Sequence, residues 1–193
     1  GRGVTFEPVS EVRVGLRRRS IVPTWPAATL VVDAFVGGER WATVVGLYAI
    51  TIDDRGTSVG HGGYSLPRLL ADIEPLFDSH RGDRVIVAGD FNLWPRDVAR
   101  VLDRYPLVDL IAETSGDRPS LEGCCGCDLG VRCGHLWTHR NRGGRNPSVQ
   151  QIDYLFASPG LLAGLDRVFG GYASFPGADE ASDHAPVVAD FRN

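Results

Sequence analysis

Residues 85–92 of this chain read Val-Ile-Val-Ala-Gly-Asp-Phe-Asn, a β-branched run that stops on a glycine and then presents an acid and a carboxamide. Such a run favours a buried strand that ends near Gly89. Residues i and i+2 of an extended backbone point to the same face. We therefore expect the side chains of Asp90 and Asn92 to converge on one ligand.

Two more apolar segments deliver acids later in the chain. Residues 152–156, Ile-Asp-Tyr-Leu-Phe, form a strand-like stretch that is interrupted by Asp153. Ser-Asp-His at positions 182–184 comes directly before the apolar run 185–189. Three strand-like segments thus each supply an acid, and two of them add an Asn or a His.

This set of side chains suits the hydrolysis of phosphate esters assisted by a metal ion. A divalent cation offsets the negative charge of the phosphoryl oxygens, while a carboxylate or an imidazole takes a proton from the attacking water. Oxygen-rich sites with few protein ligands favour Mg²⁺ or Mn²⁺ over zinc. The candidate groups are Asp90, Asn92, Asp153, Asp183 and His184.

Each of these residues also has a structural alternative. Gly-Asp after a strand is common in turns and helix caps, and Asp183 can cap a turn. Asp153 is harder to explain in this way, because a carboxylate in an apolar run is costly to bury without a partner. His184 is a candidate for that partner, and the three motifs together indicate function more strongly than any one alone.

The rest of the pattern predicts a layered α/β fold. Residues 29–35 and 41–51 are β-rich and flank a Gly-Gly pair, which predicts a hairpin. A helical pattern follows Ser65 and includes Pro75, which we expect to kink or shorten that helix. We expect a loop at the arginine triplet 17–19. A helix opening at Pro95 and strands at 85–88, 152–157 and 185–191 complete the prediction.

Size and composition predict one domain over residues 1–193, with an irregular Cys/Arg-rich loop at 113–150. The hydrophobic fraction of 43% and the charged fraction of 23% are ordinary for a globular protein. The net charge of −4 gives no overall attraction to nucleic acid, although a local patch can. The chain has neither a transmembrane-length apolar run nor a secretory signal, so we expect a cytoplasmic monomer, with a signal on a longer N-terminus as the alternative.

The three motifs, in this order, resemble the signatures of the endonuclease/exonuclease/phosphatase superfamily. Its members include pancreatic-type deoxyribonucleases, apurinic/apyrimidinic endonucleases, sphingomyelinases and inositol polyphosphate 5-phosphatases. The similarity runs from about residue 28 to the C-terminus. It implies a two-layer β-sandwich flanked by helices and a metal-dependent phosphoesterase of bacterial origin, but it does not select the substrate.

The resemblance also implies roles for individual residues. Asp90 would activate water or protonate the leaving oxygen, and Asn92 would hold the phosphate or orient Asp90. Asp183, together with Asp90, would bind the metal. His184 would contact the scissile phosphate and be oriented by Asp153.

Two aromatic residues match family positions at the rim of the site. Tyr48 stands where relatives carry a Tyr or His that faces the phosphate. Trp137 lies in the segment that resembles the family's substrate rim. For both, packing within the protein is the alternative.

One family feature has no counterpart here. Relatives carry an Asn-bearing strand and a metal-binding glutamate upstream of the Tyr48 position, and neither motif matches this chain. Glu7 and Glu11 are the glutamates near the N-terminus, but neither follows a strand of the expected kind. We therefore expect a fold that is incomplete at its N-terminus and that exposes an apolar edge. The alternative to an active enzyme is a chain that binds metal poorly and acts as a binding module.

The loop at 113–150 suggests two further sites. Cys124, Cys127, Cys133 and His135 can supply four ligands to a structural Zn²⁺, with disulfides or free thiols as alternatives. Arg140 and Arg142 lie in the best local basic patch, where arginine forks fit phosphate oxygens. An exposed loop without a ligand is the alternative for that patch.

Together these features predict a divalent-metal-dependent phosphodiesterase or endonuclease that acts on nucleic acid, with Mg²⁺ or Mn²⁺ as cofactor. A lipid or inositol phosphate hydrolase is the rival enzyme. A catalytically impaired binding module is the alternative of another class.

Overall fold

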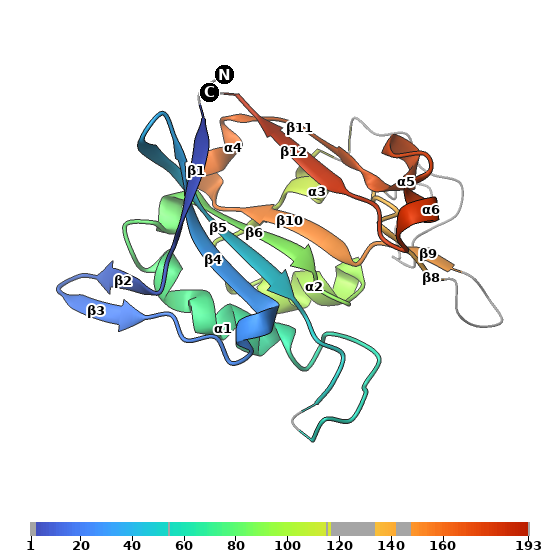
Figure 1. Ribbon diagram of the computed structural model, residues 1–193, viewed down its shortest axis with the longest axis horizontal. Helices are drawn as coiled ribbons and strands as arrows, with labels where there is room; N and C mark the ends of the chain where they lie inside the picture. Colours follow the sequence, from blue (N-terminus) through green and yellow to red (C-terminus); the bar gives the residue numbers. More distant parts are fainter. Residues whose placement is uncertain (1–2, 54, 115, 117–133, 142–147, 193) are drawn as a thin grey trace.

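A mixed sheet forms the centre of the fold, here described in a computed structural model for residues 3–53, 55–114, 116, 134–141 and 148–192 (Figure 1). Its strands in these ranges are, in spatial order, β1 (Val4–Pro8), β4 (Thr29–Val36), β5 (Glu39–Tyr48), β6 (Val85–Asp90), β10 (Asp153–Ala157) and β7 (Val108–Asp109). β5 and β6 run parallel, and the other neighbouring pairs are antiparallel. The parallel pair requires a crossover, which contains helix α1 (Leu66–Phe77).

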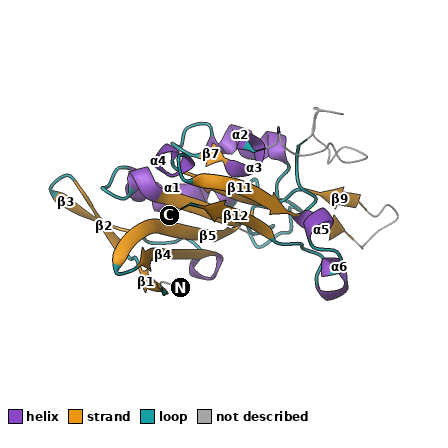
Figure 2. Ribbon diagram, turned by 90° about the horizontal axis from the view of Figure 1, so that it is seen from above, coloured by secondary structure: helices purple, strands orange, loops and turns teal. Residues whose placement is uncertain are grey.

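One face of this sheet is covered by α1 and by α2 (Pro95–Leu102), which lie on the same side of β4 and β5 in Figure 2. The alternation of β6 sends Val85 and Val87 to this face, where both are fully buried. α1 buries the stripe that its sequence predicts, which consists of Leu66, Leu69, Leu70, Ile73 and Leu76. This side of the sheet therefore holds the larger hydrophobic core.

The opposite face packs against a second, two-stranded sheet made of β11 (Leu165–Gly170) and β12 (Val187–Phe191). Short helices α3 (Leu110–Glu113) and α4 (Pro159–Leu162) complete a smaller core around Ile86, Ala157 and Val168. Two sheets flanked by helices confirm the predicted α/β class.

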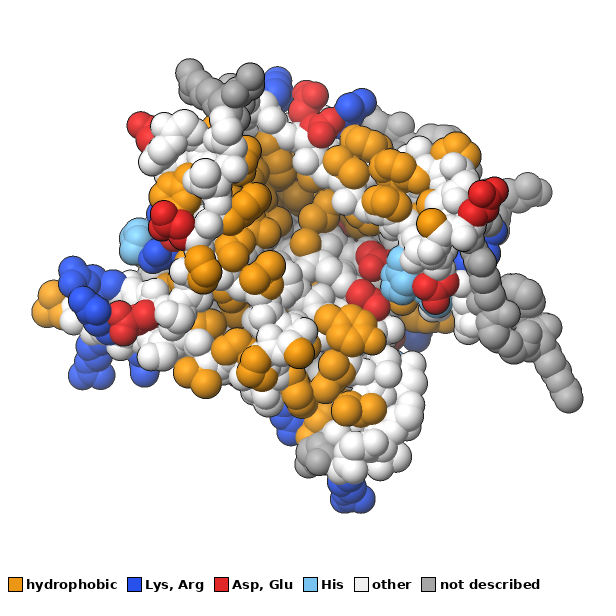
Figure 3. Space-filling view, in the orientation of Figure 1, with side chains coloured by type: hydrophobic (Ala, Val, Ile, Leu, Met, Phe, Trp, Pro, Cys, Tyr) orange, Lys and Arg blue, Asp and Glu red, His pale blue; other side chains and the backbone are white. Residues whose placement is uncertain are grey.

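The second sheet covers only part of this face. Phe6 pairs with Ala34, and Leu30 pairs with Gly46, so both side chains lie on the face that carries Ala42. They are 61% and 59% exposed. Figure 3 shows hydrophobic side chains gathered around the hollow that results. Exposed apolar surface was expected at an edge of the sheet, and the structure places it on the face of the outer strands.

Two segments differ from the sequence prediction because strand pairing supplies structure that local patterns do not indicate. The arginine triplet belongs to β3 (Arg17–Ser20), which forms a hairpin with β2 (Glu11–Val14) rather than a loop. The loop at 113–150 includes strands β8 (His139–Asn141) and β9 (Ser148–Gln150), which pair with each other. That hairpin borders the site described below.

The boundaries of the predicted elements shift in two places. Pro75 does not shorten α1, which continues to Phe77, since the proline stands in the last turn of the helix. The final strand begins at Val187 rather than at Ala185, because Ala185 donates its N–H to the carbonyl of Thr138 outside the sheet. The remaining short elements are η1 (Pro26–Ala28), η2 (Gly82–Arg84), α5 (Gly171–Ser174) and α6 (Ala178–Ala181).

Candidate active site

Three predicted site residues lie in one row across the central sheet. The register pairs Tyr48 of β5 with Asp90 of β6, and Asp90 with Asp153 of β10. Asp90 follows Ile86 and Ala88 at intervals of two, so its side chain points toward the face that carries β11 and β12. The row stands where β5 and β6 end and β10 begins.

Asp90 and Asn92 converge through a turn rather than along an extended strand. β6 ends at Asp90, and Asn92 has a φ of 47°, in the left-handed region. Its backbone N–H donates to Oδ1 of Asp90 at 2.8 Å, and its Nδ2 donates to Oδ2 at 3.2 Å. Nδ2 also donates to the carbonyl of Ala49 at 2.9 Å. Asn92 therefore holds both oxygens of the Asp90 carboxylate.

His184 reaches the row from the segment before β12. Its Nδ1 lies 3.0 Å from Oδ2 and 3.2 Å from Oδ1 of Asp153. Its Nε2 lies 4.0 Å from Oδ2 of Asp90. Because Nδ1 is engaged by Asp153, Nε2 is the ring atom that His184 presents to a ligand. The structure therefore brings Asp90, Asn92, Asp153 and His184 together.

The hairpin of β8 and β9 adds a second imidazole, which the sequence analysis missed. His139 forms an isolated β-bridge with His184, and the two rings lie 4.7 Å apart. Nε2 of His139 lies 3.7 Å from Oδ2 of Asp183, and its Nδ1 lies 2.9 Å from the side-chain amide of Gln150. The sequence placed His139 in a basic loop, and the only signal that could have singled it out was a hairpin that pairs it with Gln150.

Neighbouring groups fix the position of this hairpin against the row. The buried hydroxyl of Thr138 accepts the N–H groups of Ile152 and Asp153, each at 3.2 Å. The N–H of Arg140 donates to the carbonyl of Asp183 at 2.8 Å. Hydrogen bonds from the Thr138 hydroxyl and from the Arg140 N–H therefore join the segments that carry Asp153, His139 and Asp183.

The charges in the site alter three pKa values. Burial, together with the charge of Asp153, raises the pKa of Asp90 from 3.8 to about 6, although the bonds from Asn92 oppose the shift. The bond that His184 makes to Asp153 raises the pKa of that imidazole, and the carboxylates of Asp90 and Asp183 add to the effect. Burial and the nearby His184 lower the pKa of His139. His184 therefore keeps its proton to higher pH than His139 does.

Two groups of side chains in the described part of the chain have a donor set that could hold a cation. Asp90, Asp153 and His184 form one group, and His139, Asp183 and His184 form the other. Within each group the ligand atoms lie within 4.8 Å of one another. A cation would relieve the repulsion between Asp90 and Asp153, and Nδ1 of His139 is held by Gln150 outside both groups, as one nitrogen of a metal-binding histidine commonly is. The donor chemistry therefore fits a divalent metal.

Several other predicted residues stand at the edge of the site. Asp183 is the most solvent-exposed acid of the cluster, with 60% of its side chain accessible. The guanidinium of Arg140 lies 4.7 Å over the ring of Tyr172. Tyr48 is 49% exposed, and the carbonyl of Trp137 accepts the N–H of Tyr172. Figure 3 shows acidic and histidine side chains together beside the hollow.

The remaining predictions concern other parts of the chain. Two predicted sites lie partly outside the described residues. The basic patch loses Arg142, and the structural zinc site loses Cys124, Cys127 and Cys133. His135, the remaining residue of the zinc prediction, is half-buried. Glu7 pairs across β1 and β4 with Asp33, and Glu11 forms an ion pair with Arg18 at 3.0 Å. In the described ranges, neither glutamate belongs to a candidate cation group.

Comparison with known proteins identifies the family. The model of the Endonuclease/Exonuclease/phosphatase family matches residues 11–184. This chain belongs to that family. The match spans the row of Tyr48, Asp90 and Asp153 and ends at His184. No curated protein sequence matches the chain significantly.

Solved structures of this family share the fold. The 3′ phosphatase NExo (D146N) from Neisseria, bound to a product DNA hairpin, is 18% identical with a TM-score of 0.52, and the match covers 84% of this chain and 65% of that one. An AP endonuclease from Archaeoglobus fulgidus is 16% identical with a TM-score of 0.58, covering 99% and 79%. The endonuclease domain of the retrotransposon TRAS1 is 15% identical with a TM-score of 0.56, covering 100% and 82%. The chain thus spans less than two thirds of the first of these structures. Within the described residues, no helix is long and apolar enough to cross a membrane.

Proposed function

We propose that this protein is a divalent-metal-dependent phosphodiesterase that hydrolyses nucleic acid. The observation that carries the proposal is the cluster in which His184 lies 3.0 Å from Asp153 and 4.0 Å from Asp90. A base, an imidazole and an acid that orients the imidazole are the groups that phosphoryl hydrolysis requires. The structures that share the fold include a 3′ phosphatase bound to product DNA and an AP endonuclease, which favours nucleic acid as the substrate.

Asp90 is proposed as the group that exchanges a proton with the reacting water. Its carboxylate is held at both oxygens by Asn92, and burial keeps its pKa at about 6. A base with a pKa just below neutrality is ionised at physiological pH and still takes a proton effectively. Water then attacks phosphorus and its proton passes to Asp90. The bond to the leaving oxygen breaks, its electron pair stays on that oxygen, and the oxygen takes a proton from solvent.

His184 is proposed to contact the phosphate through Nε2. The bond between Nδ1 and Asp153 fixes the ring and favours its protonated form, so Nε2–H can donate to a phosphoryl oxygen. Asn92 uses both hydrogens of Nδ2 on Ala49 and Asp90. This supports its role in orienting Asp90 rather than in donating to the phosphate.

We propose that carboxylates of the two candidate groups hold Mg²⁺ or Mn²⁺, with Asp90 and Asp183 as the principal oxygen ligands, while His184 contacts the phosphate. When bound, the cation supplies positive charge to the phosphoryl oxygens. Tyr48 is proposed to face the phosphate, since it stands beside Asp90 in the register and its ring is accessible. Arg140 is held beside the site by the bond from its N–H to the carbonyl of Asp183, and its guanidinium, which lies over the ring of Tyr172, is proposed to bind a substrate phosphate.

Hydrolysis of a fluorescent DNA oligonucleotide with Mg²⁺ or Mn²⁺ tests the proposal, with abasic duplex, sphingomyelin and an inositol phosphate as parallel substrates. Asp90→Ala and His184→Ala should each lower turnover of the nucleic acid by roughly 100-fold or more. Asp166→Ala is the matched control, because that exposed acid pairs with Arg192 at 3.6 Å. Preferential turnover of the lipid or the inositol phosphate would favour the rival enzyme. Binding of DNA without cleavage would favour the impaired binding module.

A further inference from the structure

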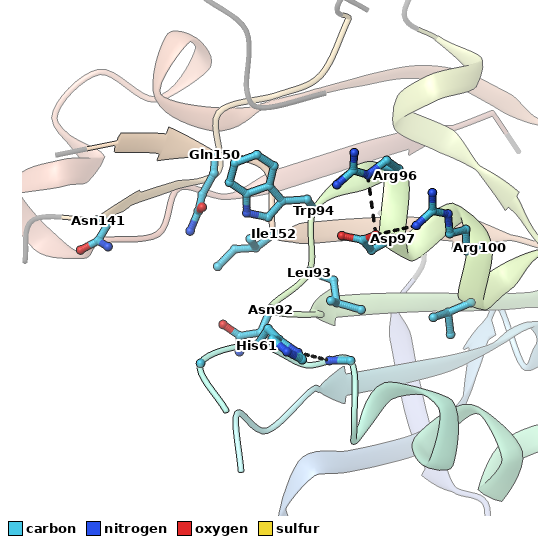
Figure 4. A pocket seen from close by; sticks show the side chains of 13 residues that line it. His61, Asn92, Leu93, Trp94, Arg96, Asp97, Arg100, Asn141, Gln150 and Ile152 are labelled. Atoms are coloured by element: carbon cyan, nitrogen blue, oxygen red, sulfur yellow. Dashed lines mark hydrogen bonds and ion pairs between the residues drawn. The ribbon is translucent and has the colours of Figure 1, made fainter. Parts of the chain in front are cut away.

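A cleft of about 810 Å³ opens beside the candidate active site, between α2 and the hairpin of β8 and β9 (Figure 4). Two of its lining residues also contact the site directly. Asn92 donates to Oδ2 of Asp90, and the side chain of Gln150 bonds to Nδ1 of His139. A group bound in the cleft would therefore adjoin a phosphate held at Asp90 and His184. The volume lies within the range of small-ligand pockets, roughly 300–1,000 Å³.

Trp94 supplies an aromatic wall that is fixed by the start of α2. Its carbonyl accepts the N–H groups of Asp97 at 2.9 Å and Val98 at 3.0 Å, which anchors its backbone. Its side chain is 44% exposed. In Figure 4 the indole lies near Gln150 and Ile152, with Asn92 and His61 across the cleft. A large exposed ring on a fixed backbone is a surface on which a planar group can stack.

Two arginines give the same cleft a positive charge. Arg96 and Arg100 stand four residues apart on α2, and such residues lie on one side of a helix. They share the carboxylate of Asp97, with Nε of Arg96 at 3.8 Å and Nη1 of Arg100 at 3.4 Å from Oδ1. Two guanidinium groups thus stand beside one carboxylate in the lining of the cleft. Both guanidinium side chains are more than half exposed, so they can reach a phosphate in solvent.

His61 provides a polar donor on the opposite wall. Its Nδ1 accepts the N–H of Gly63 at 3.1 Å, so the proton of the neutral ring resides on Nε2. The loop that carries it is held against the Asp90 turn, because Gly62 donates to the carbonyl of Asn92 at 2.8 Å. A side chain in place of Gly62 would meet the carbonyl of Phe91, which shows how closely the loop packs.

We propose that this cleft binds an unpaired, unstacked nucleobase next to the scissile phosphate, with the base on Trp94 and the adjoining phosphate near Arg96 and Arg100. The inference rests on the proposed function and narrows its substrate to single-stranded or locally unpaired nucleic acid. A base in an intact duplex is stacked between its neighbours, so it cannot present its face to the indole. Base–aromatic stacking tolerates any sequence, because every base has a π-face.

Binding measurements test the cleft separately from catalysis. An Asp90→Asn background prevents turnover while Mg²⁺ is present, and anisotropy of a labelled single-stranded decamer gives its Kd. Adding Trp94→Ala should weaken binding of the decamer by roughly 5- to 150-fold. Trp94→Phe should restore most of that loss, because it keeps an aromatic face. Trp25→Phe is the matched control, since Trp25 packs against the larger core.

Two further measurements separate stacking from charge. Intrinsic tryptophan fluorescence should be quenched by the decamer, and Trp94→Phe should remove that quenching while Trp25→Phe keeps it. Arg96→Ala and Arg100→Ala should each lower the slope of log Kd against log salt concentration by up to about 1, which corresponds to the loss of one phosphate contact. Thermal unfolding of every variant checks that it is folded.

The outcomes distinguish this inference from the proposed function. An unchanged Kd for folded Trp94→Ala, or duplex binding as tight as that of the decamer, would overturn the cleft assignment even if the wild-type protein cleaves DNA. The cleft assignment would also be overturned if sphingomyelin vesicles displaced the decamer equally well from the Trp94→Ala protein and from its parent. Tight binding that depends on Trp94, without cleavage by the wild-type protein, would support the cleft and contradict the hydrolase.

Discussion

Asp153 and His184 are joined by a contact of 3.0 Å between Oδ2 and Nδ1, although Asp153 belongs to the central sheet and His184 to the segment that precedes β12. Asp153 is the first residue of β10, and its register partner is Asp90. The contact therefore ties the imidazole from the segment before β12 to the row of acids on the central sheet. The predictions below follow from this link and from the charges around it.

Asp153→Asn should lower the pKa of His184, because the carboxylate is the largest cause that raises it. The ring would also lose the partner that fixes its tautomer, so hydrolysis should fall by roughly 10²- to 10⁴-fold. NMR titration of His184 and steady-state kinetics measure the two effects. Asp166→Asn provides the control, and an unchanged titration of His184 would show that the contact does not govern the imidazole.

The rate of hydrolysis should depend on pH through the raised pKa values of Asp90 and His184. Asp90 must be ionised to accept a proton, so kcat/KM should rise as pH increases through about 6. His184 must be protonated to donate to the phosphate, so activity should fall above its raised pKa. A bell-shaped profile is expected, and Asp153→Asn should move its alkaline limb to lower pH. An alkaline limb at the same pH in both proteins would contradict the assignment.

Asp90→Asn should stabilise the protein while it removes activity. The folded state raises the pKa of Asp90 from 3.8 to about 6, so folding favours its protonated form. That contribution is present below pH 3.8 and is lost as the pH rises through about 6. At pH 7.5 in EDTA, replacing the ionised acid should increase the free energy of unfolding by about 1 to 3 kcal/mol. Urea unfolding of both proteins measures it, and equal stability at pH 7.5 would argue against a destabilised carboxylate.

His139→Ala should weaken cation binding or activity by roughly 10- to 100-fold, as losses around metal sites commonly do. The reason is that His139 lies 3.7 Å from Asp183 and forms a candidate cation group with Asp183 and His184. Thermal unfolding with increasing Mn²⁺ gives the affinity, because a cation that binds the folded state raises Tm. His80→Ala is a matched control, and a Mn²⁺ response equal to that of the wild-type protein would remove His139 from the site.

The sequence alone determined the elements that carry the chemistry. The β-branched run before Asp90 favoured a buried strand, and the helical stripe after Ser65 predicted α1; both elements are present, since these patterns depend on local residue types and spacing. The resemblance carried by three motifs led to the family, which the family model confirms over residues 11–184. Local patterns are sufficient in these places because one face of each element is buried.

Only the tertiary structure decided how distant residues meet. The row of Tyr48, Asp90 and Asp153 depends on the register of three strands, and a shift by one residue would turn the acids to the opposite face. His139 entered the site through a bridge to His184, and Trp94 became a cleft wall because α2 begins beside the Asp90 turn. Such relationships arise from pairing and packing between segments far apart in the chain, which no local pattern of residues specifies.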